Sequence, residues 1–335
     1  SSSYTIYSGY AVSPTIEGNI ITRVGSYGIY LGAAAGLSNV RNNIVLEAGS
    51  YGIYLGAGST ATNNTVVNTG SYGLSGGTRK NNIAYAGGTG FWDCTTEPAT
   101  YNLSYRNTTN FGASCDGTGS VTAPPRFLNL SAPGTFIKNA NGVSTGLTAT
   151  TLTMTGAGWT ADQWKGYFLT PDITRSQPQY FLIISNTATT LTVVSANSLT
   201  SFGAVGRPYA ITDFTFGTDA PGAAPAGASG GPANDIYGNA KTANDIGAVM
   251  ATASVTSLTS PSTYYIATGG TDAFGGIASS CDLATAPCRT INLAVGYAES
   301  GDTIKIAKGD HSLGYTIEVG LTKNLTFEGG YDTAD

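Results

Sequence analysis

Charged side chains are scarce in this sequence. Only 10% of its 335 residues are Asp, Glu, Lys or Arg, whereas roughly 25% is usual for soluble domains. The formal net charge is −5, so the chain has no excess of basic residues with which to bind a phosphate backbone. We therefore expect no nucleic-acid partner.

Histidine and long apolar runs are also scarce. The chain has a single His, and none of its cysteines have the C-x2-C spacing that zinc sites commonly use. No segment reaches the roughly 18 consecutive apolar residues of a membrane-spanning helix. These absences predict no metal, no cofactor and no membrane span.

Cysteine is limited to four residues, which fall into two local pairs. Cys94 and Cys115 bracket one short segment, and Cys281 and Cys288 bracket another. This spacing predicts two disulfide bonds. Because disulfides persist in oxidising compartments, we expect an extracellular or cell-surface protein.

Glycine is abundant, with 46 residues, and much of it belongs to a repeated phrase. The letters GSYGIYL occupy residues 25–31 and return at residues 49–55, and GSYGLS begins at residue 70. Each copy follows an apolar run that starts with asparagine, and with a weaker fourth copy the steps are 24, 21 and 18 residues. A repeat with a period of about 20–50 residues indicates stacked supersecondary units. The equivalent asparagines are Asn19, Asn43, Asn64 and Asn82.

Each copy has room for two or three short strands of β-prone residues but not for a helix of ordinary length. This predicts a parallel β-helix in which equivalent residues of successive coils lie about 4.8 Å apart. We expect the asparagines to form an internal ladder of stacked amides, and Arg23 to pair with Glu47 of the next coil. Further ladders are predicted for Ile20, Ile44, Thr65 and Ile83; for Ile29, Ile53, Leu74 and Phe91; and for Tyr27, Tyr51 and Tyr72.

Changes in composition divide the chain into four segments. Residues 1–131 hold the coils, and residues 147–213 alternate apolar and polar side chains in longer runs, which predicts a small antiparallel β module. Residues 214–263 are a Gly-, Ala- and Pro-rich connector with a closing segment, and residues 264–335 begin another β pattern. The expected core of the antiparallel module includes Trp159, Trp164, Tyr167, Phe168, Phe181 and Ile183.

Several of these stretches resemble a known family. The C-terminal letters YYIATGGTD, CDLATAPCRTI and GDTIKIAKG, and the repeated coils that begin with NNI, are similar to secreted bacterial right-handed parallel β-helix proteins of the pectin-lyase-like superfold. ANDIYGNAKTANDIGAVMA resembles a closing segment of that family, with Tyr237 and Lys241 where Asp and Arg are usual. The resemblance implies an all-β, right-handed parallel β-helix with an inserted antiparallel module. The superfold serves lyases, hydrolases, adhesins and surface fibres, so it implies no single activity.

The order of these segments is unusual for that family. A cap typical of the start of a solenoid comes last, and a closing segment precedes it. We therefore expect the first and last strands to offer free edges, through which identical copies join head to tail as a filament, a surface fibre or part of a giant adhesin. The expected edge residues are Tyr4, Ile6 and Tyr7 at one end and Leu325, Phe327 and Glu328 at the other.

Candidates for catalysis are few. The paired-acid motifs of the hydrolase branch are missing, and a lyase would need a base and a charge neutraliser, which Arg79, Lys80, Asp93 and Arg106 could supply. His311 is interpreted as a turn residue, and Asp272 alone is too little acid for a calcium site. The sequence leaves open whether Tyr27, Tyr51 and Tyr72 point inward or outward to contact sugar.

These patterns favour a non-enzymatic extracellular structural protein, the repeat unit of a head-to-tail β-helical filament or cell-surface fibre. The alternative is a polysaccharide-binding or polysaccharide-cleaving β-helix protein. Its predicted partners are copies of itself and, in the alternative, a cell-surface or extracellular polysaccharide.

Overall fold

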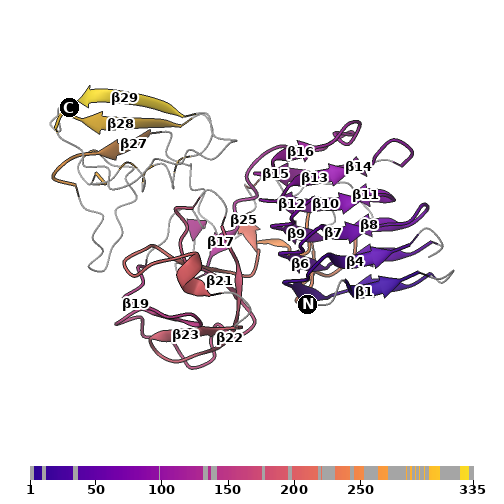
Figure 1. Cartoon of the computed structure of the whole chain (residues 1–335), viewed down its shortest axis with the longest axis horizontal. Helices are drawn as coiled ribbons and strands as arrows, with labels where there is room; N and C mark the ends of the chain where they lie inside the picture. The colour runs from indigo at the N-terminus through magenta and orange to yellow at the C-terminus, as the bar shows by residue number, and fades with distance from the viewer. Residues whose placement is uncertain are drawn as a thin grey trace. The chain divides into compact units, whose positions relative to one another are not determined.

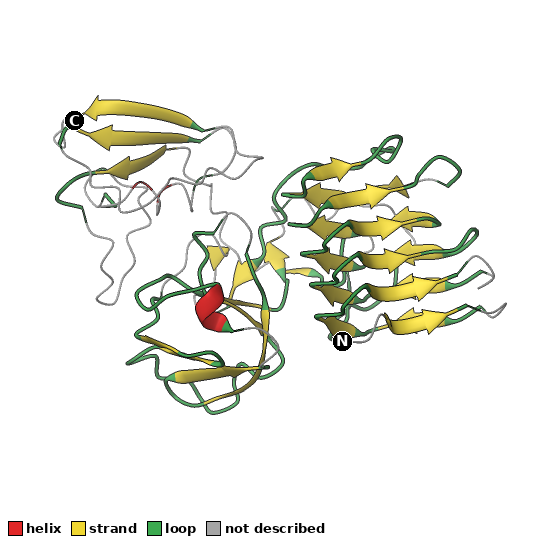
Figure 2. Cartoon of the chain, in the orientation of Figure 1, coloured by secondary structure: helices red, strands yellow, loops and turns green. Residues whose placement is uncertain are grey.

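The computed structural model describes residues 4–9, 13–32, 37–97, 99–130, 135–136, 142–175, 178–194, 198–217, 220, 231–241, 245–252, 263–270, 284, 287–288, 291, 294, 298, 302–309 and 325–331. The described part is dominated by β-strands (Figure 2). It divides into two compact units. One contains Ser1–Phe127 and Phe214–Ser254, and the other contains Leu128–Asp213 and Val255–Asp335.

The first unit is a parallel β-helix whose coils stack strand upon strand (Figure 1). Three parallel sheets, which we call A, B and C, form its sides. Sheet A contains β1 (Tyr4–Ser8), β4 (Tyr27–Leu31), β7 (Tyr51–Tyr54), β10 (Tyr72–Ser75), β13 (Thr89–Trp92) and β16 (Thr109–Phe111). Sheet B contains β2 (Thr15–Glu17), β5 (Asn39–Arg41), β8 (Thr60–Thr62), β11 (Thr78–Lys80) and β14 (Ala99–Thr100). Sheet C contains β3 (Ile20–Thr22), β6 (Ile44–Leu46), β9 (Thr65–Val67), β12 (Ile83–Tyr85) and β15 (Leu103–Tyr105).

The register of these sheets follows the sequence repeat. Ile29 pairs with Ile53, and Leu74 pairs with both Ile53 and Phe91. These four side chains are fully buried in the core between the sheets. The all-β parallel solenoid predicted from the repeat is therefore confirmed.

The repeated glycines allow the coils to stack closely. A Cβ atom at Gly49 would meet the carbonyl oxygen of Gly25 one coil away. A Cβ atom at Gly52 would meet the core side chain of Val66 and lie 2.7 Å from the carbonyl oxygen of Gly73. Any larger residue would push neighbouring coils apart, which explains why both glycines of the GSYG phrase return in each copy.

The corner between sheets B and C has the same two-residue length in each coil. Its first residue is left-handed, with φ of 51° at Asn42, 56° at Asn63 and 57° at Asn81, a conformation that asparagine tolerates better than most residues. Its second residue belongs to the asparagine ladder. The side-chain amide of Asn43 donates to the Oδ1 atom of Asn64 at 2.9 Å.

The asparagine ladder runs through all five of these corners or their equivalents. Asn19, Asn43, Asn64 and Asn82 each donate a side-chain hydrogen bond to the next member, at 2.9–3.1 Å, and the last acceptor is Asn102. Several amides also bond a strand carbonyl of the preceding coil, as Asn64 does with Val40 at 2.9 Å. The ladder therefore satisfies buried backbone groups that no sheet hydrogen bond reaches.

The outer face of sheet C is covered by the chain itself. The outward side chains of Ile44, Leu46, Val67 and Ile83 are at most 1% exposed. Residues 245–249 lie against this face, because Gly247 donates its backbone N–H to the carbonyl of Asn81 at 2.7 Å and Ala248 donates to the hydroxyl of Thr65 at 3.0 Å. The short strands β25 (Phe216–Gly217) and β26 (Ala251–Thr252) pair in parallel within the same cover.

Phe214–Ser254 belong to the coil unit, and they include the closing segment expected within residues 214–263. Polar contacts fix it as well. Asn63 donates to the carbonyls of Asp245 and Gly247, and the Lys241 ammonium donates to the Gly247 carbonyl at 2.6 Å. Burial lowers the pKa of Lys241 to about 8, and the charges of Asp245 and Asp235 oppose that shift.

The second unit contains the antiparallel module. Its core includes Trp164, Phe181 and Ile183, with Trp159 and Tyr167 packed against it, and Phe168 is also fully buried. The six-stranded sheet has the order β19 (Gly146–Leu147), β20 (Thr151–Thr153), β23 (Thr190–Val193), β22 (Phe181–Asn186), β21 (Phe168–Thr170) and β24 (Ala210–Thr212). Smaller elements are β17 (Leu128–Asn129), β18 (Thr135–Phe136) and the 3-10 helix η1 (Leu199–Ser201). The parallel strands β27 (Thr263–Ile266), β28 (Thr303–Ala307) and β29 (Thr326–Tyr331) complete it.

Candidate functional site

The outer face of sheet A has two columns of aromatic side chains that run along the solenoid. We call these eight residues the aromatic face. The first column is Tyr4, Tyr27, Tyr51 and Tyr72, which occupy equivalent positions of β1, β4, β7 and β10. The second column is Tyr7, Tyr30, Tyr54 and Trp92, with Ser75 between the last two.

Most neighbouring rings within a column are nearly parallel, although Tyr51 and Tyr72 are tilted by 35°. Tyr27 and Tyr51 have centroids 4.9 Å apart and planes 7° apart, and Tyr30 and Tyr54 have centroids 5.0 Å apart and planes 8° apart. The second column begins with Tyr7 stacked on Tyr30 at 5.4 Å and 5°. Parallel in-register strands impose this spacing, because equivalent residues lie one strand spacing apart.

In the middle of the face, rings of different columns are nearly perpendicular. The planes of Tyr27 and Tyr30 make an angle of 80° at a centroid distance of 5.1 Å, and those of Tyr51 and Tyr54 make an angle of 90° at 5.7 Å. Both arrangements are favourable for aromatic pairs, at about 0.5–1.5 kcal/mol each. Ring faces are thus used against neighbouring rings, so the surface presents ring edges and phenol hydroxyl groups.

The aromatic face is only partly buried. Trp92 is 42% exposed and Tyr7 is 56% exposed, while Tyr27, Tyr30 and Tyr51 are half-buried. Partial burial, followed by the neighbouring phenols, raises the pKa of Tyr30 and Tyr51 above the ordinary value of 10.0. These side chains are therefore neutral hydrogen-bonding groups at physiological pH.

The aromatic face is also uncharged. None of the six strands of sheet A contains Asp, Glu, Lys, Arg or His. The first carboxylate beside it is Asp93, which follows Trp92 at the end of β13. A ligand that carries many negative charges would find no cation on this surface to compensate them.

The two columns converge at Trp92. Its indole packs on Tyr72 at a centroid distance of 5.3 Å and an angle of 31°. The next coil has Gly112 beside it, where a Cβ atom would lie 2.7 Å from the indole Cε3 atom. The absence of a side chain at Gly112 gives the indole its space.

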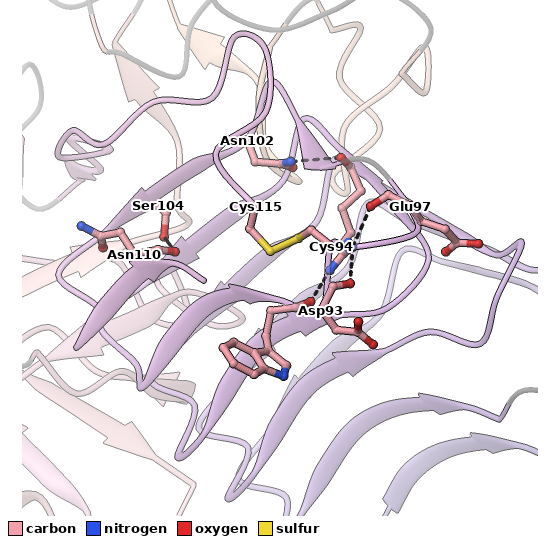
Figure 3. The surroundings of a disulfide bond; sticks show 9 residues. Asp93, Cys94, Glu97, Asn102, Ser104, Asn110 and Cys115 are labelled. Carbon is pink, nitrogen blue, oxygen red and sulfur yellow. Dashed lines mark hydrogen bonds between the residues drawn. A yellow bond between two sulfur atoms is a disulfide. The ribbon is translucent and has the colours of Figure 1, made fainter. Parts of the chain in front are cut away.

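A disulfide fixes the segment that follows Trp92. Cys94 and Cys115 are bonded (Figure 3), which confirms the first of the two predicted pairs. Cys281 of the second pair lies outside the described residues, so that bond stays a prediction. Both Cys94 and Cys115 are buried in the coil core.

Arg79 is fully buried beside this disulfide and acts as a structural cross-link. Its guanidinium donates to the carbonyl oxygens of Trp92 at 2.5 Å, Asp93 at 2.9 Å and Glu97 at 3.4 Å. Burial lowers its pKa to about 10, although the charges of Asp93 and Glu97 oppose that shift. The segment that follows β13 is also held by Glu97, whose carboxylate accepts a hydrogen bond from the backbone N–H of Gly58 at 2.6 Å.

The structure does not assemble the residues named for a lyase. Arg79 is enclosed and bonded to carbonyl groups, and Arg106 contacts the hydroxyl of Tyr85 at 3.3 Å on sheet C. Lys80 lies at the end of a sheet B strand. Among the residues that the structure describes, no group of three or more His, Cys, Asp or Glu is placed to hold a metal ion.

The other candidates have simpler positions. Tyr4, Ile6 and Tyr7 lie on β1, which pairs with β4, and Phe327 and Glu328 lie on β29, which pairs with β28, with Leu325 just before it. Arg23 and Glu47 form the expected ion pair, with Nε and Oε2 2.9 Å apart. His311 and Asp272 lie outside the described residues.

Sequence reasoning missed five of the eight residues of the aromatic face. It found Tyr27, Tyr51 and Tyr72 but treated Tyr4 and Tyr7 only as edge residues and did not align the second column. A signal was available: Tyr30 and Tyr54 each follow the first-column tyrosine by three positions, inside the repeated phrase.

Stacked parallel coils define a β-helix protein, and its aromatic face is partly exposed in the part of the chain that the structure describes. Consistent with this, residues 1–89 match the family described as "Right handed beta helix region". Neither the curated proteins nor the solved structures contain a significant match to the chain. Within the described residues, no helix is long and apolar enough to cross a membrane.

Proposed function

We propose that this protein is a polysaccharide-binding β-helix and that the aromatic face is its binding surface. The observation that carries the proposal is the continuous, uncharged and half-exposed array of seven tyrosines and one tryptophan. Large exposed aromatic patches on a soluble domain are uncommon and typically mark interaction sites.

Ring edges and phenol hydroxyls suit a polyhydroxylated ligand. Each of the first four coils contributes one or two phenol hydroxyl groups, which can donate to and accept from sugar hydroxyls. Trp92 adds a platform for the apolar face of a sugar ring, because its indole is 42% exposed. Successive residues of each column lie one strand spacing of about 4.8 Å apart, so an extended glycan that runs along the solenoid meets a regular series of contacts.

The absence of charge favours a neutral glycan. A polyuronate carries a carboxylate on each sugar, and such groups are normally held by Arg or Lys. The strands of sheet A provide neither residue. We therefore expect β-glucans, xylans or galactans to bind in preference to polygalacturonate or alginate.

Affinity electrophoresis tests the proposal, with the full chain run through gels that contain one soluble polysaccharide at a time. Retardation by a neutral glycan is expected, and the Tyr30→Ala/Tyr54→Ala variant should bind at least about tenfold more weakly, which corresponds to about 1.4 kcal/mol. Thr62→Ala, on the outer face of sheet B, is the matched control and should bind as the wild type does. Equal mobility in every gel would refute the proposal.

A head-to-tail filament, with or without a role in adhesion, stays a prediction from the order of the sequence segments. Its extracellular or cell-surface location has the same standing. Negative-stain electron microscopy of the purified chain tests it: filaments with a regular axial repeat support it, and uniformly single particles at high protein concentration contradict it.

A further inference from the structure

The aromatic face also has a geometry suited to covalent chemistry between its own rings. We propose that it is a site of oxidative cross-linking, at which a peroxidase using hydrogen peroxide joins tyrosines of neighbouring coils into dityrosine. This inference rests on ring geometry and exposure, and is independent of whether the face binds a glycan.

The column pairs bring equivalent ring atoms together. When two rings are parallel and related by one strand spacing, each ring carbon lies about as far from its counterpart as the centroids do. Those distances are 4.9 Å for Tyr27 and Tyr51 and 5.0 Å for Tyr30 and Tyr54. A modest rotation of half-exposed rings about their χ2 angles is enough to bring two carbons ortho to the hydroxyl groups into contact.

The chemistry is balanced by one molecule of hydrogen peroxide. The peroxidase removes one hydrogen atom, an electron with its proton, from each of two phenol hydroxyls, and the peroxide is reduced to two molecules of water. The two phenoxyl radicals form a carbon–carbon bond between their ortho positions. Each ring then moves its ortho hydrogen to its oxygen, which restores aromaticity and both hydroxyl groups.

The surroundings favour coupling over other fates of the radical. The strands of sheet A carry no cysteine, and the nearby Cys94 and Cys115 are already joined in a disulfide. Because the pKa of Tyr30 and Tyr51 is raised, both are phenols at neutral pH and lose the proton together with the electron. Each bond would tie one coil to the next, as the Cys94–Cys115 disulfide does for the coils of β13 and β16.

Tyr85 and Tyr105 provide an internal comparison. Their rings are also nearly parallel, at 10°, but the centroids are 6.4 Å apart and both residues are only 9% exposed. Phe127 packs edge-on against Tyr85 at 5.8 Å, so these rings are enclosed on sheet C. We expect little or no coupling there.

The test is to treat the dilute full chain with peroxidase and hydrogen peroxide and to map tryptic peptides by mass spectrometry. Cleavage after Arg23, Arg41 and Arg79 places Tyr27 and Tyr30 in peptide 24–41, and Tyr51, Tyr54 and Tyr72 in peptide 42–79. The expected product is these two peptides joined with the loss of two hydrogen atoms, together with dityrosine fluorescence in the monomer band of a denaturing gel.

Two variants make the test specific. Tyr51→Phe/Tyr54→Phe keeps both rings but removes both hydroxyls of one coil, and should lower the yield of the joined peptides at least tenfold. Tyr85→Phe should leave that yield unchanged. The proposal is overturned if the joined peptides are missing from the monomer, or if their yield is the same in the double variant as in the wild type.

Discussion

Sheets A and C belong to the same coils, yet the outer face of sheet C is buried and that of sheet A is partly exposed. Sheet C presents Ile44, Leu46 and Ile83 outward, where they are at most 1% exposed, and the chain returns at residues 245–249 to lie against this face. Sheet A presents aromatic rings outward, and the described residues include no comparable cover over them. The two faces show that apolar content alone does not decide which side of a coil is closed.

The two faces differ in whether their side chains can form hydrogen bonds with water. The aliphatic side chains of sheet C have no polar group, so exposing them costs roughly 25 cal/mol for each Å² of apolar surface. The tyrosines of sheet A are partly exposed, carry a hydroxyl that can bond water, and pack their rings on neighbouring rings. A face of stacked tyrosines can therefore be stable without a cover like that of sheet C.

The sharpest way to test this comparison is to place the same charge on each face of one coil. Leu46 on β6 is 1% exposed, and Tyr54 on β7 is half-buried. Leu46→Asp buries an unpaired carboxylate and should destabilise the coil unit by at least about 3 kcal/mol. Tyr54→Asp leaves the carboxylate in water and loses the ring contacts with Tyr30 and Tyr51, which should cost about 1–3 kcal/mol. Urea denaturation followed by circular dichroism measures both, and similar losses would show that sheet C is less well covered than described.

Alkaline pH should act on the open face with a smaller effect. The pKa of Tyr30 and Tyr51 is higher in the folded chain than the ordinary value of 10.0. Their contribution to stability is therefore complete below pH 10, and it is lost as the pH rises through the folded-state values, because the unfolded chain loses these protons first.

Lys241 under the cover of sheet C changes stability in the opposite direction. Its pKa is lowered to about 8, so the unfolded chain binds more protons than the folded chain between about pH 8 and 10.5, and stability rises over that window. Comparing wild type with Tyr51→Phe cancels this contribution. Between about pH 9.5 and 11, a window around the ordinary phenol pKa, the variant should lose less stability than the wild type. Equal losses in urea midpoints would contradict the raised pKa of Tyr51.

The smallest expected effect compares two cross-coil ion pairs. Arg23 and Glu47 have side chains 11% and 10% exposed, whereas Arg41 and Glu17 on sheet B are 45% and 38% exposed, and the closest atoms are 2.9 Å apart in both pairs. Double-mutant cycles should give about 1–2 kcal/mol of coupling for the enclosed pair and less than about 1 kcal/mol for the exposed pair. A larger coupling in the exposed pair would mean that enclosure does not strengthen these contacts.

The coil architecture was predictable because it repeats locally. Asparagine and glycine recur at equivalent positions for steric and hydrogen-bonding reasons that act between adjacent coils, so the order of letters carries the register. The fifth asparagine, Asn102, escaped this reasoning because its coil lacks the GSYG phrase. Its hydrogen bond with Asn82 became evident only from the structure.

The cover over sheet C and the role of Arg79 were not predictable in the same way. Gly247 and Asn81 are far apart in sequence, and nothing in either stretch specifies the other. Arg79 looks like an exposed charge in the letters TRK. Its guanidinium is buried instead, because it donates hydrogen bonds to three carbonyl groups in a loop held by a disulfide. The outward direction of Tyr27 and Tyr51 likewise required the three-dimensional coil.

The fixed corner between sheets B and C has a consequence for how such a protein can change over time. That corner always takes two residues, whereas the connections from sheet A to sheet B span residues 32–38, 55–59, 76–77 and 93–98. Insertions and deletions in the connection from sheet A to sheet B leave the asparagine ladder and both tyrosine columns in register. Evolution, or a protein engineer, can therefore add new loops beside the aromatic face while the coils that support it keep their geometry.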